Sequence, residues 1–236
     1  MIIYLTRHGQ VCPAEHIGSV DFPKGDIPLT ETGIRQARCL GNYLKLHKFS
    51  GSIISSPYRR TMMTAQEISM ITGCGIYPDG ILREMFFSDG DAADFEGMDL
   101  HQLKSEFLNV AEDAVLEYPW WTKKADSLEE ISMRTKPLIE KLIQNNKGEY
   151  LLIGHGASVF ATLYYLSGKY GLDLPKDYPA FGNHLATRNL NCNLSVIEIE
   201  SGVLKAARLF ITKHLDEVLL SSNTNIVKRP LEYIKQ

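Results

Sequence analysis

The sequence predicts an α/β fold, in which buried strands and helices alternate around a central sheet. Two unbroken apolar runs, at 2–5 and 150–153, are typical of strands that are covered on both faces. Between them, apolar residues recur at helical spacing, as they do over 34–44. Each apolar run leads into a His-Gly pair, so polar residues stand at the strand ends where open α/β sheets bind ligands.

The composition limits the class of protein. The 236 residues suit a single domain with an insertion, and 44% hydrophobic with 22% charged residues is ordinary for a globular protein. A net charge of -3 leaves no basic surplus for holding a nucleic acid or an anionic membrane. No apolar run is long enough to cross a bilayer, so we expect neither nucleic-acid nor membrane binding.

The amino terminus and the cysteines favour a cytoplasmic protein. The first apolar run ends at Leu5 with no small-residue cleavage site after it, which is unlike a signal peptide. Cys12, Cys39, Cys74 and Cys192 are widely spaced and form no Cys-x-x-Cys pair. This pattern predicts neither a disulfide framework nor a cysteine zinc site, and a reducing compartment is expected.

The first part of the chain carries clear boundary signals. Thr30 is a candidate N-cap for the helix over 34–44, and Gly73 is a candidate stop for a second helix. A short buried strand at 52–55 precedes this second helix, and a brief strand at 76–78 follows it. Strands and helices are therefore expected to alternate up to residue 78.

A segment of different character follows, over 85–121. Seven aromatic and nine acidic residues crowd into it beside a single base, Lys104, which gives a local charge of -8 with His101 counted as neutral. We interpret 85–126 as an inserted lid. The alternative is a packed helical hairpin whose acidic residues form a solvated face.

The next helix has a marked start. Ser127 and Glu130 match a capping box, and Gly148 is the expected end of the helix. Pro137 lies inside this stretch and predicts a kink or a later start.

The last part of the chain is expected to return to the sheet. Ser201-Gly202 is a hairpin signal between two strands, and the tail after Asn223 is predicted to be a surface extension. The other elements expected here are a helix at 157–166, a loop-rich stretch at 168–189, and strands at 194–200 and 203–211.

Four strand ends supply a set of charged and polar side chains. Two of them carry Arg7 with His8-Gly9 and His155-Gly156, and the other two supply Arg60 and Glu84. A glycine after each histidine lets the backbone approach a bound anion, and helix N-termini after the strands add free N–H groups. Two arginines, two histidines and a carboxylate on one sheet edge suit a phosphoryl group.

The chemistry of phosphoryl transfer explains this choice of residues. Catalysis is mainly positioning and stabilisation of charge on three equatorial oxygens, to which Arg7 and Arg60 can offer forked donors that stay charged. One neutral histidine can attack phosphorus in line while the other holds the equatorial oxygens. A carboxylic acid such as Glu84 can protonate the leaving oxygen and then, as a carboxylate, activate water.

Each of these residues also has an ordinary structural interpretation. His155 between glycines could be a turn residue, Arg60 a helix-surface cation, and Glu84 a partner of Arg83. A metal site is another alternative, because histidine and carboxylate are common ligands. However, no histidine pair has i, i+4 spacing, and two arginines would repel a divalent cation, so neither a metal nor another cofactor is expected.

Five motifs at these positions resemble those of the histidine phosphatase superfamily, which is phosphoglycerate mutase-like. They are, in the family's order, Leu5-Thr6-Arg7-His8-Gly9, 28–33, 55–65, Leu82-Arg83-Glu84 and Gly154-His155-Gly156. The resemblance implies a three-layer α/β sandwich, with a mainly parallel central sheet flanked by helices, plus the inserted lid. It also implies one domain over 1–236 that needs no metal.

The resemblance assigns roles to individual residues. His8 would be the nucleophile that becomes phosphohistidine, and Glu84 would be the acid and base. Arg60 is preferred to Arg59 because the family's arginine precedes a small residue, here Thr61. The residues expected to contact phosphate or substrate are Arg7, Arg60, His155, Gly9, Gln10 and Gly156.

The sequence departs from the family pattern in several places. Ala14 stands where many members have an asparagine, and Ala125-Asp126-Ser127 replaces a common Gly-Glu-Ser. Phe95-Glu96-Gly97 comes later than the usual Trp-Glu-Gly-like turn, and 85–121 lacks the arginine cluster with which mutases grip a second anionic group. His184 and Arg188 could reach the pocket from a late loop, although a surface position is preferred for each.

The leading prediction is a metal-independent phosphomonoesterase, a hydrolase of the histidine acid phosphatase type. It would act on a small-molecule phosphate ester. The charge of -8 over 85–121 disfavours a bisphosphorylated substrate, and the aromatic residues of the lid could cover a flat group. The alternatives are mutase-type phosphoryl transfer, a phosphoprotein phosphatase, and a phosphate-binding module without turnover. The substrate and the oligomeric state, a homodimer included, stay open.

Overall fold

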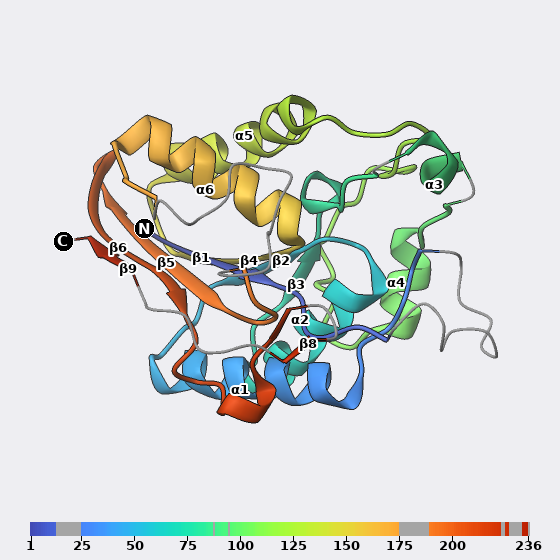
Figure 1. Cartoon of the computed structure of the whole chain (residues 1–236), viewed down its shortest axis with the longest axis horizontal. Helices are drawn as coiled ribbons and strands as arrows, with labels where there is room; N and C mark the ends of the chain where they lie inside the picture. Colours follow the sequence, from blue (N-terminus) through green and yellow to red (C-terminus); the bar gives the residue numbers. More distant parts are fainter. Residues whose placement is uncertain are drawn as a thin grey trace.

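The computed structural model describes residues 1–12, 25–86, 88–93, 95–174, 189–222, 225–226 and 233–235. Its centre is a seven-stranded sheet with the strand order β3-β2-β4-β1-β5-β6-β9 (Figure 1). The strands are β1 (Ile2–Arg7), β2 (Ser52–Ser55), β3 (Ile76–Pro78), β4 (Glu149–Gly154), β5 (Leu194–Glu200), β6 (Val203–Ile211) and β9 (Tyr233–Lys235). A separate two-stranded pair consists of β7 (Ser221–Ser222) and β8 (Asn225–Ile226).

The direction of the strands confirms the mainly parallel sheet. β1, β4, β2 and β3 are parallel neighbours, whereas β5, β6 and β9 are added one after another by antiparallel pairing. Five of the seven strands therefore run in the same direction. The carboxyl ends of the four parallel strands meet at one edge, since Arg7 pairs with Gly154, and Ser55 pairs with Ile153 and Pro78.

Helices cover both faces of the sheet and complete the expected three layers. In Figure 1, α1 and α2 lie against one face, and α5 and α6 lie against the other. The helices are α1 (Glu31–Leu46), α2 (Arg59–Thr72), α3 (Asp89–Ala93), α4 (Leu100–Glu106), α5 (Leu128–Asn145) and α6 (Gly156–Tyr170), with short 3-10 turns η2 (Gly80–Leu82) and η3 (Glu217–Leu219). Within the described ranges, no helix combines the length and the apolar character needed to cross a bilayer.

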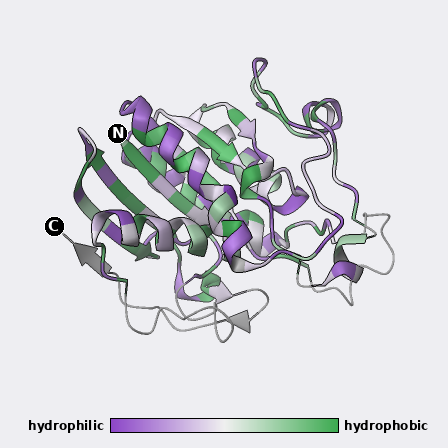
Figure 2. Ribbon diagram, turned by 90° about the horizontal axis from the view of Figure 1, so that it is seen from above, coloured by the Kyte–Doolittle hydropathy of each residue, from purple (hydrophilic) through white to green (hydrophobic). Residues whose placement is uncertain are grey.

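Each face of the sheet has its own hydrophobic core. Tyr4 points into the core beneath α1 and α2, whereas its neighbours Ile3 and Leu5 point into the core beneath α5 and α6. This alternation is the two-residue period of a strand, and it explains why the apolar run of β1 is unbroken. Figure 2 shows the hydrophobic colour concentrated on the central strands and mixed colours on the covering helices.

Several boundary signals act as the sequence predicted. Thr30 caps α1 by accepting a hydrogen bond from the Gly33 N–H at 3.0 Å. Gly73 ends α2 in the left-handed conformation, with φ of 79°. Ser127 and Glu130 form both bonds of a capping box at the start of α5.

Two expectations about element ends are wrong. Helix α5 starts at Leu128 and contains Pro137, so the later start is excluded and the kink stays a prediction. Asn146 in the left-handed conformation (φ 48°) ends the helix before Gly148. The Asn146 N–H bonds back to two carbonyls, which closes the helix early. Helix α6 does not end before the predicted loop at 168 but continues to Tyr170, because it keeps packing on the core until Gly171 turns the chain (φ 60°).

The tail after Asn223 is not simply a surface extension. Its strand β9 pairs antiparallel with β6, which would otherwise leave an open edge. The pairing covers three residues, from Ala207 opposite Lys235 to Leu209 opposite Tyr233. The formation of so short a strand depends on the edge strand with which it pairs rather than on its own sequence.

The segment at 85–126 starts and ends at the same place. The Asp126 N–H donates to the Phe86 carbonyl at 2.9 Å, and the Phe86 N–H donates to Asp126 Oδ2 at 3.1 Å. In between lie α3 and α4, which are short and do not form the alternative helical hairpin. Four buried side chains, Phe86, Ala92, Phe95 and Trp120, pack around Tyr58 of the main domain.

Candidate active site

The carboxyl-terminal edge of the parallel strands brings the five expected catalytic residues together. Arg7 and His8 lie at the end of β1, and His155 lies between β4 and α6. Arg60 lies in the first turn of α2 after β2, and Glu84 follows β3 and η2. The arrangement follows from the parallel register, since each strand delivers its residues to the same edge.

His8 is a buried histidine in a fixed orientation. Its side chain is 3% exposed, and its Nδ1 lies 2.7 Å from the Gly9 carbonyl oxygen. A carbonyl only accepts hydrogen bonds, so Nδ1 carries the proton and Nε2 keeps its lone pair. Burial, together with Arg60 and Arg7, lowers the pKa of His8 well below its usual range, so the ring is neutral at pH 7. A neutral imidazole with a free Nε2 lone pair is a competent nucleophile.

His155 faces His8 across the site. The two rings are 5.3 Å apart between centroids at an interplanar angle of 61°. Burial, with help from Arg60, His8, Arg7 and Arg134, lowers the pKa of His155 well below its usual range. Its Nε2 lies 2.9 Å from the Ser56 hydroxyl, and its Nδ1 lies 3.6 Å from Glu84 Oε2.

Two arginines make the site positive. Arg7 and Arg60 are each only 7% exposed. Burial lowers the pKa of Arg7 to about 10, with Glu84 opposing the shift and Arg60 adding to it, so the guanidinium stays charged at pH 7. Arg60 Nη2 lies 3.9 Å from Glu84 Oε2, and Arg59 turns away to pair with Asp26 and Glu106. One carboxylate between two buried guanidiniums leaves a net positive site that suits an oxyanion.

Glu84 is held by its neighbours along the chain. Its side chain is 23% exposed, and its Oε1 accepts from the Met85 N–H at 3.1 Å. Arg83, the residue before it, makes two hydrogen bonds of 2.6 Å to the Asp126 carboxylate. Asp126 also accepts from Arg134 and from the Phe86 N–H, so it fixes the backbone on both sides of Glu84.

Most of the chain matches a known family. The model of the histidine phosphatase superfamily (branch 1) matches residues 3–212. The chain belongs to the histidine phosphatase superfamily. A putative phosphoserine phosphatase 2 from Hydrogenobacter thermophilus is 33% identical over 167 residues, which are 70% of this chain and 78% of that protein.

Other comparisons agree with this membership. A probable phosphoglycerate mutase GpmB from Yersinia pestis is 26% identical over 224 residues, covering 91% of this chain and 94% of that protein. The crystal structure of ecdysone phosphate phosphatase from Bombix mori, in complex with tungstate, superposes with a TM-score of 0.63. At 19% identity over 84% of this chain and 89% of that one, it shows a shared fold.

The other residues expected to contact phosphate or substrate, Gly9, Gln10 and Gly156, make hydrogen bonds within the protein. Gly9 donates its N–H to Thr64 Oγ1 at 3.1 Å, and a Cβ there would come within 2.5 Å of the Gly33 carbonyl oxygen. Close packing against Gly33 therefore requires this glycine. Gln10 accepts from the Thr30 hydroxyl at 2.8 Å. The Gly156 carbonyl accepts from Asn189 Nδ2 at 3.0 Å. Ala14, His184 and Arg188 lie outside the described residues.

The sequence motifs did not reveal a buried loop, residues 189–193, whose asparagines form hydrogen bonds near the ends of β1 and β4. The Asn189 carbonyl accepts from Arg7 Nη1 at 3.0 Å, and the Asn189 amide reaches Gly156. Asn191 Nδ2 donates to the His8 carbonyl at 3.0 Å. The signal in the sequence was the run Asn189-Leu190-Asn191-Cys192-Asn193 directly before a buried strand, which is too polar for the core unless its amides are bonded.

Three aromatic side chains of 85–126 are turned inward. Phe86, Phe95 and Trp120 are between 0% and 7% exposed. The Phe95 ring stacks on Tyr58 at 4.7 Å, and the Tyr58 ring meets the edge of His155 at 5.0 Å. These three rings therefore pack on Tyr58 beside His155 and are not free to cover a flat group, whereas Tyr118 is 59% exposed and covering by such a ring stays a prediction.

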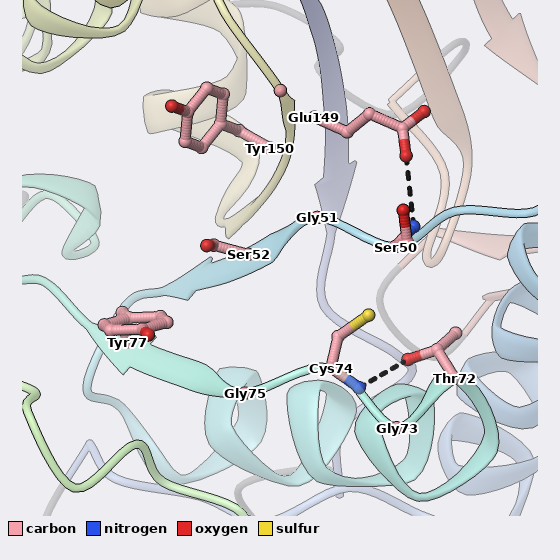
Figure 3. Close-up of a pocket in the computed structure, with 11 residues that line it drawn as sticks. Ser50, Gly51, Ser52, Thr72, Gly73, Cys74, Gly75, Tyr77, Glu149 and Tyr150 are labelled. Atoms are coloured by element: carbon pink, nitrogen blue, oxygen red, sulfur yellow. Dashed lines mark hydrogen bonds between the residues drawn. The ribbon is translucent and has the colours of Figure 1, made fainter.

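A pocket lies at the opposite edge of the sheet. Figure 3 shows this pocket, of about 560 Å³, near the starts of β2 and β4 and just before β3. Its carboxylate, Glu149, already accepts from the Tyr4 hydroxyl and from the Ser50 N–H, each at 3.0 Å. None of the five expected catalytic residues lines it. The five residues expected to act on phosphate thus lie at the carboxyl-terminal edge and not at this pocket.

Proposed function

We propose that this chain is a metal-independent phosphomonoesterase that hydrolyses a small-molecule phosphate ester through a phosphohistidine. The observation that carries the proposal is the pair of buried guanidiniums, Arg7 and Arg60, converging on two neutral histidines. Such a site stabilises the charge on the equatorial oxygens without a metal. Among the described residues, no cluster of three His, Cys, Asp or Glu side chains is arranged to hold a metal ion.

The reaction has two balanced steps. In the first, the His8 Nε2 lone pair forms a bond to phosphorus, the ester P–O bond breaks, and Glu84 gives its proton to the leaving oxygen. In the second, the Glu84 carboxylate takes a proton from water, the hydroxide attacks phosphorus, and the P–N bond breaks to release inorganic phosphate. Arg7, Arg60 and His155 hold the phosphoryl oxygens in both steps.

The experiment is hydrolysis of para-nitrophenyl phosphate in excess EDTA. Wild type should release phosphate, and His8→Ala should be inactive because it lacks the nucleophile. His47→Ala is the matched control, since it removes an exposed histidine at the end of α1. Activity that EDTA abolishes would contradict the metal-free mechanism. An active His8→Ala would contradict the phosphohistidine.

The mutase alternative rests on one observation, the 26% identity to a probable phosphoglycerate mutase over 91% of this chain. Against it stands the acidic segment at 85–121, which has no arginine for a second anionic group. 3-Phosphoglycerate with and without a bisphosphate primer separates the two activities. Primer-dependent isomerisation supports a mutase, and release of free phosphate supports the phosphatase.

We also propose that 85–126 acts as a lid over the site. Its two ends meet at Phe86 and Asp126, as they do in an insertion, and its inner face packs on Tyr58 beside His155. Its negative charge disfavours bisphosphates and phosphopeptides rich in acidic residues. A substrate panel that ranks bisphosphates first would refute this selectivity.

The cysteines support a cytoplasmic location for this activity. Cys12, Cys39, Cys74 and Cys192 are all free thiols. Free thiols are typical of a reducing compartment.

A further inference from the structure

Ser56 stands directly behind His155. It follows the last residue of β2, its side chain is fully buried, and its backbone N–H donates to the Ile153 carbonyl at 2.9 Å. Its own carbonyl accepts from the Thr61 hydroxyl at 2.8 Å. These backbone bonds on both sides give the Ser56 side chain little freedom, and its hydroxyl lies 2.9 Å from His155 Nε2.

The two histidines of the site are oriented by opposite kinds of partner. His8 Nδ1 meets a carbonyl oxygen, which can only accept. His155 Nε2 meets a hydroxyl, which can donate or accept. The tautomer of His8 is therefore settled by its partner, whereas that of His155 depends on which way the serine proton points.

The surroundings of the other ring nitrogen of His155, Nδ1, indicate which way the hydrogen bond between Ser56 and Nε2 runs. Nδ1 is buried and has no hydrogen-bond partner among the described residues, and Glu84 Oε2 at 3.6 Å is too far for a bond. This nitrogen points to the edge where Arg60 and Glu84 meet. A lone pair there would repel a phosphoryl oxygen, whereas an N–H would bind it.

We propose that Ser56 is a positioning residue: its hydroxyl donates to His155 Nε2 and thereby holds the proton of the ring on Nδ1, facing the phosphoryl group. This inference rests on the proposed function for its catalytic consequence. The proton arrangement itself does not depend on turnover. Burial lowers the pKa of His155, which agrees with a neutral ring having one proton to place.

The direct test is the ¹⁵N spectrum of the histidine rings in the phosphate-free protein. Long-range ¹H–¹⁵N correlations separate a protonated ring nitrogen from an unprotonated one, and His155→Asn identifies the signal. Wild type should show protonated Nδ1 and unprotonated Nε2. In Ser56→Ala the population should move toward protonated Nε2. Protonated Nε2 in the wild type would overturn the proposal, and so would an unchanged spectrum in the variant.

Kinetics provide the second readout. Ser56→Ala should lower kcat with para-nitrophenyl phosphate by roughly ten- to a hundredfold, by analogy with the loss of a residue that orients a metal-binding histidine. Ser56→Thr keeps the hydroxyl and should restore most of the rate. Ser69→Ala is the matched control, because Ser69 is equally buried but bonds the Cys74 carbonyl at 2.5 Å.

The outcomes separate this inference from the proposed function. An inactive wild type with protonated Nδ1 would refute the phosphatase and leave the role of Ser56 in the tautomer standing. An active wild type whose rate is unaffected by Ser56→Ala would refute the role of Ser56 alone. If the alanine variant fails to fold, the wild-type spectrum and the threonine variant still decide.

Discussion

Replacing Asp126 with alanine should destabilise the protein severely. Its carboxylate is 6% exposed and bonds Arg83 twice at 2.6 Å and Arg134 at 3.3 Å. Burial alone would raise the pKa of Asp126, yet the bonds from Arg83 and the Phe86 N–H lower it overall. The variant leaves two guanidiniums, 9% and 16% exposed, without their carboxylate.

The expected loss is about 3–5 kcal/mol of unfolding free energy, the cost of removing one partner from a buried ion pair. A domain of this kind has about 5–15 kcal/mol in total, so the loss takes a large share of it. Equilibrium urea unfolding, followed by circular dichroism, measures it as a lower midpoint at constant slope. Because Arg83 and Phe86 flank Glu84, kcat should fall as well.

The control for Asp126→Ala is an exposed ion pair. Glu200 is 73% exposed and lies 3.2 Å from Lys205, so Glu200→Ala should cost less than about 1 kcal/mol. If Asp126→Ala unfolds at the same urea concentration as Glu200→Ala, the buried network does not stabilise the fold and the reasoning fails.

Three further variants or conditions test other parts of the structure. The pKa values of His8 and His155 are lowered in the folded state, so below about pH 6.5 the unfolded chain binds protons that the folded chain does not bind. The free energy of unfolding should therefore fall by up to about 2.7 kcal/mol for each pH unit below this value. Urea titrations across pH 5–7 measure this fall, and a free energy of unfolding that does not change with pH would contradict it. Gly9→Ala should lose about 1–3 kcal/mol, because its Cβ meets the Gly33 carbonyl oxygen at 2.5 Å; an unchanged thermal midpoint would count against this packing. Asn191→Ala leaves the His8 carbonyl without its amide donor and should cost about 1–3 kcal/mol together with a lower kcat, both of which a wild-type-like variant would exclude.

Much of the fold follows from short-range patterns. The strands β1 and β4 are apolar on both faces, so their runs are visible without knowledge of their neighbours. The caps at Thr30 and Ser127 are local chemistry and were equally visible. In contrast, β9 is defined by the open edge of β6, and no property of three residues reveals that edge.

In the candidate site, too, some features could be predicted from short-range patterns and others could not. His8 and His155 stand directly after readable strands, so their proximity could be predicted from the parallel sheet. The groups that orient them come from distant positions: Ser56 reaches His155 across 99 residues, and Asn191 reaches His8 across 183. Such pairings depend on the exact register of the loops, which the sequence pattern does not encode.

The place of β1 in the sheet has a consequence for biosynthesis. The strand that carries Arg7 and leads into His8 is made before both of its neighbours, since its parallel neighbour β4 begins at Glu149 and its antiparallel neighbour β5 ends at Glu200. At roughly 5–20 residues per second of translation, the ribosome needs on the order of ten seconds or more to deliver β4. During that interval an apolar strand waits without a partner on either side. The nascent chain is therefore open to chaperone binding and to aggregation until β4 and β5 emerge. A chain truncated before β4 should never assemble the candidate site, because it lacks His155.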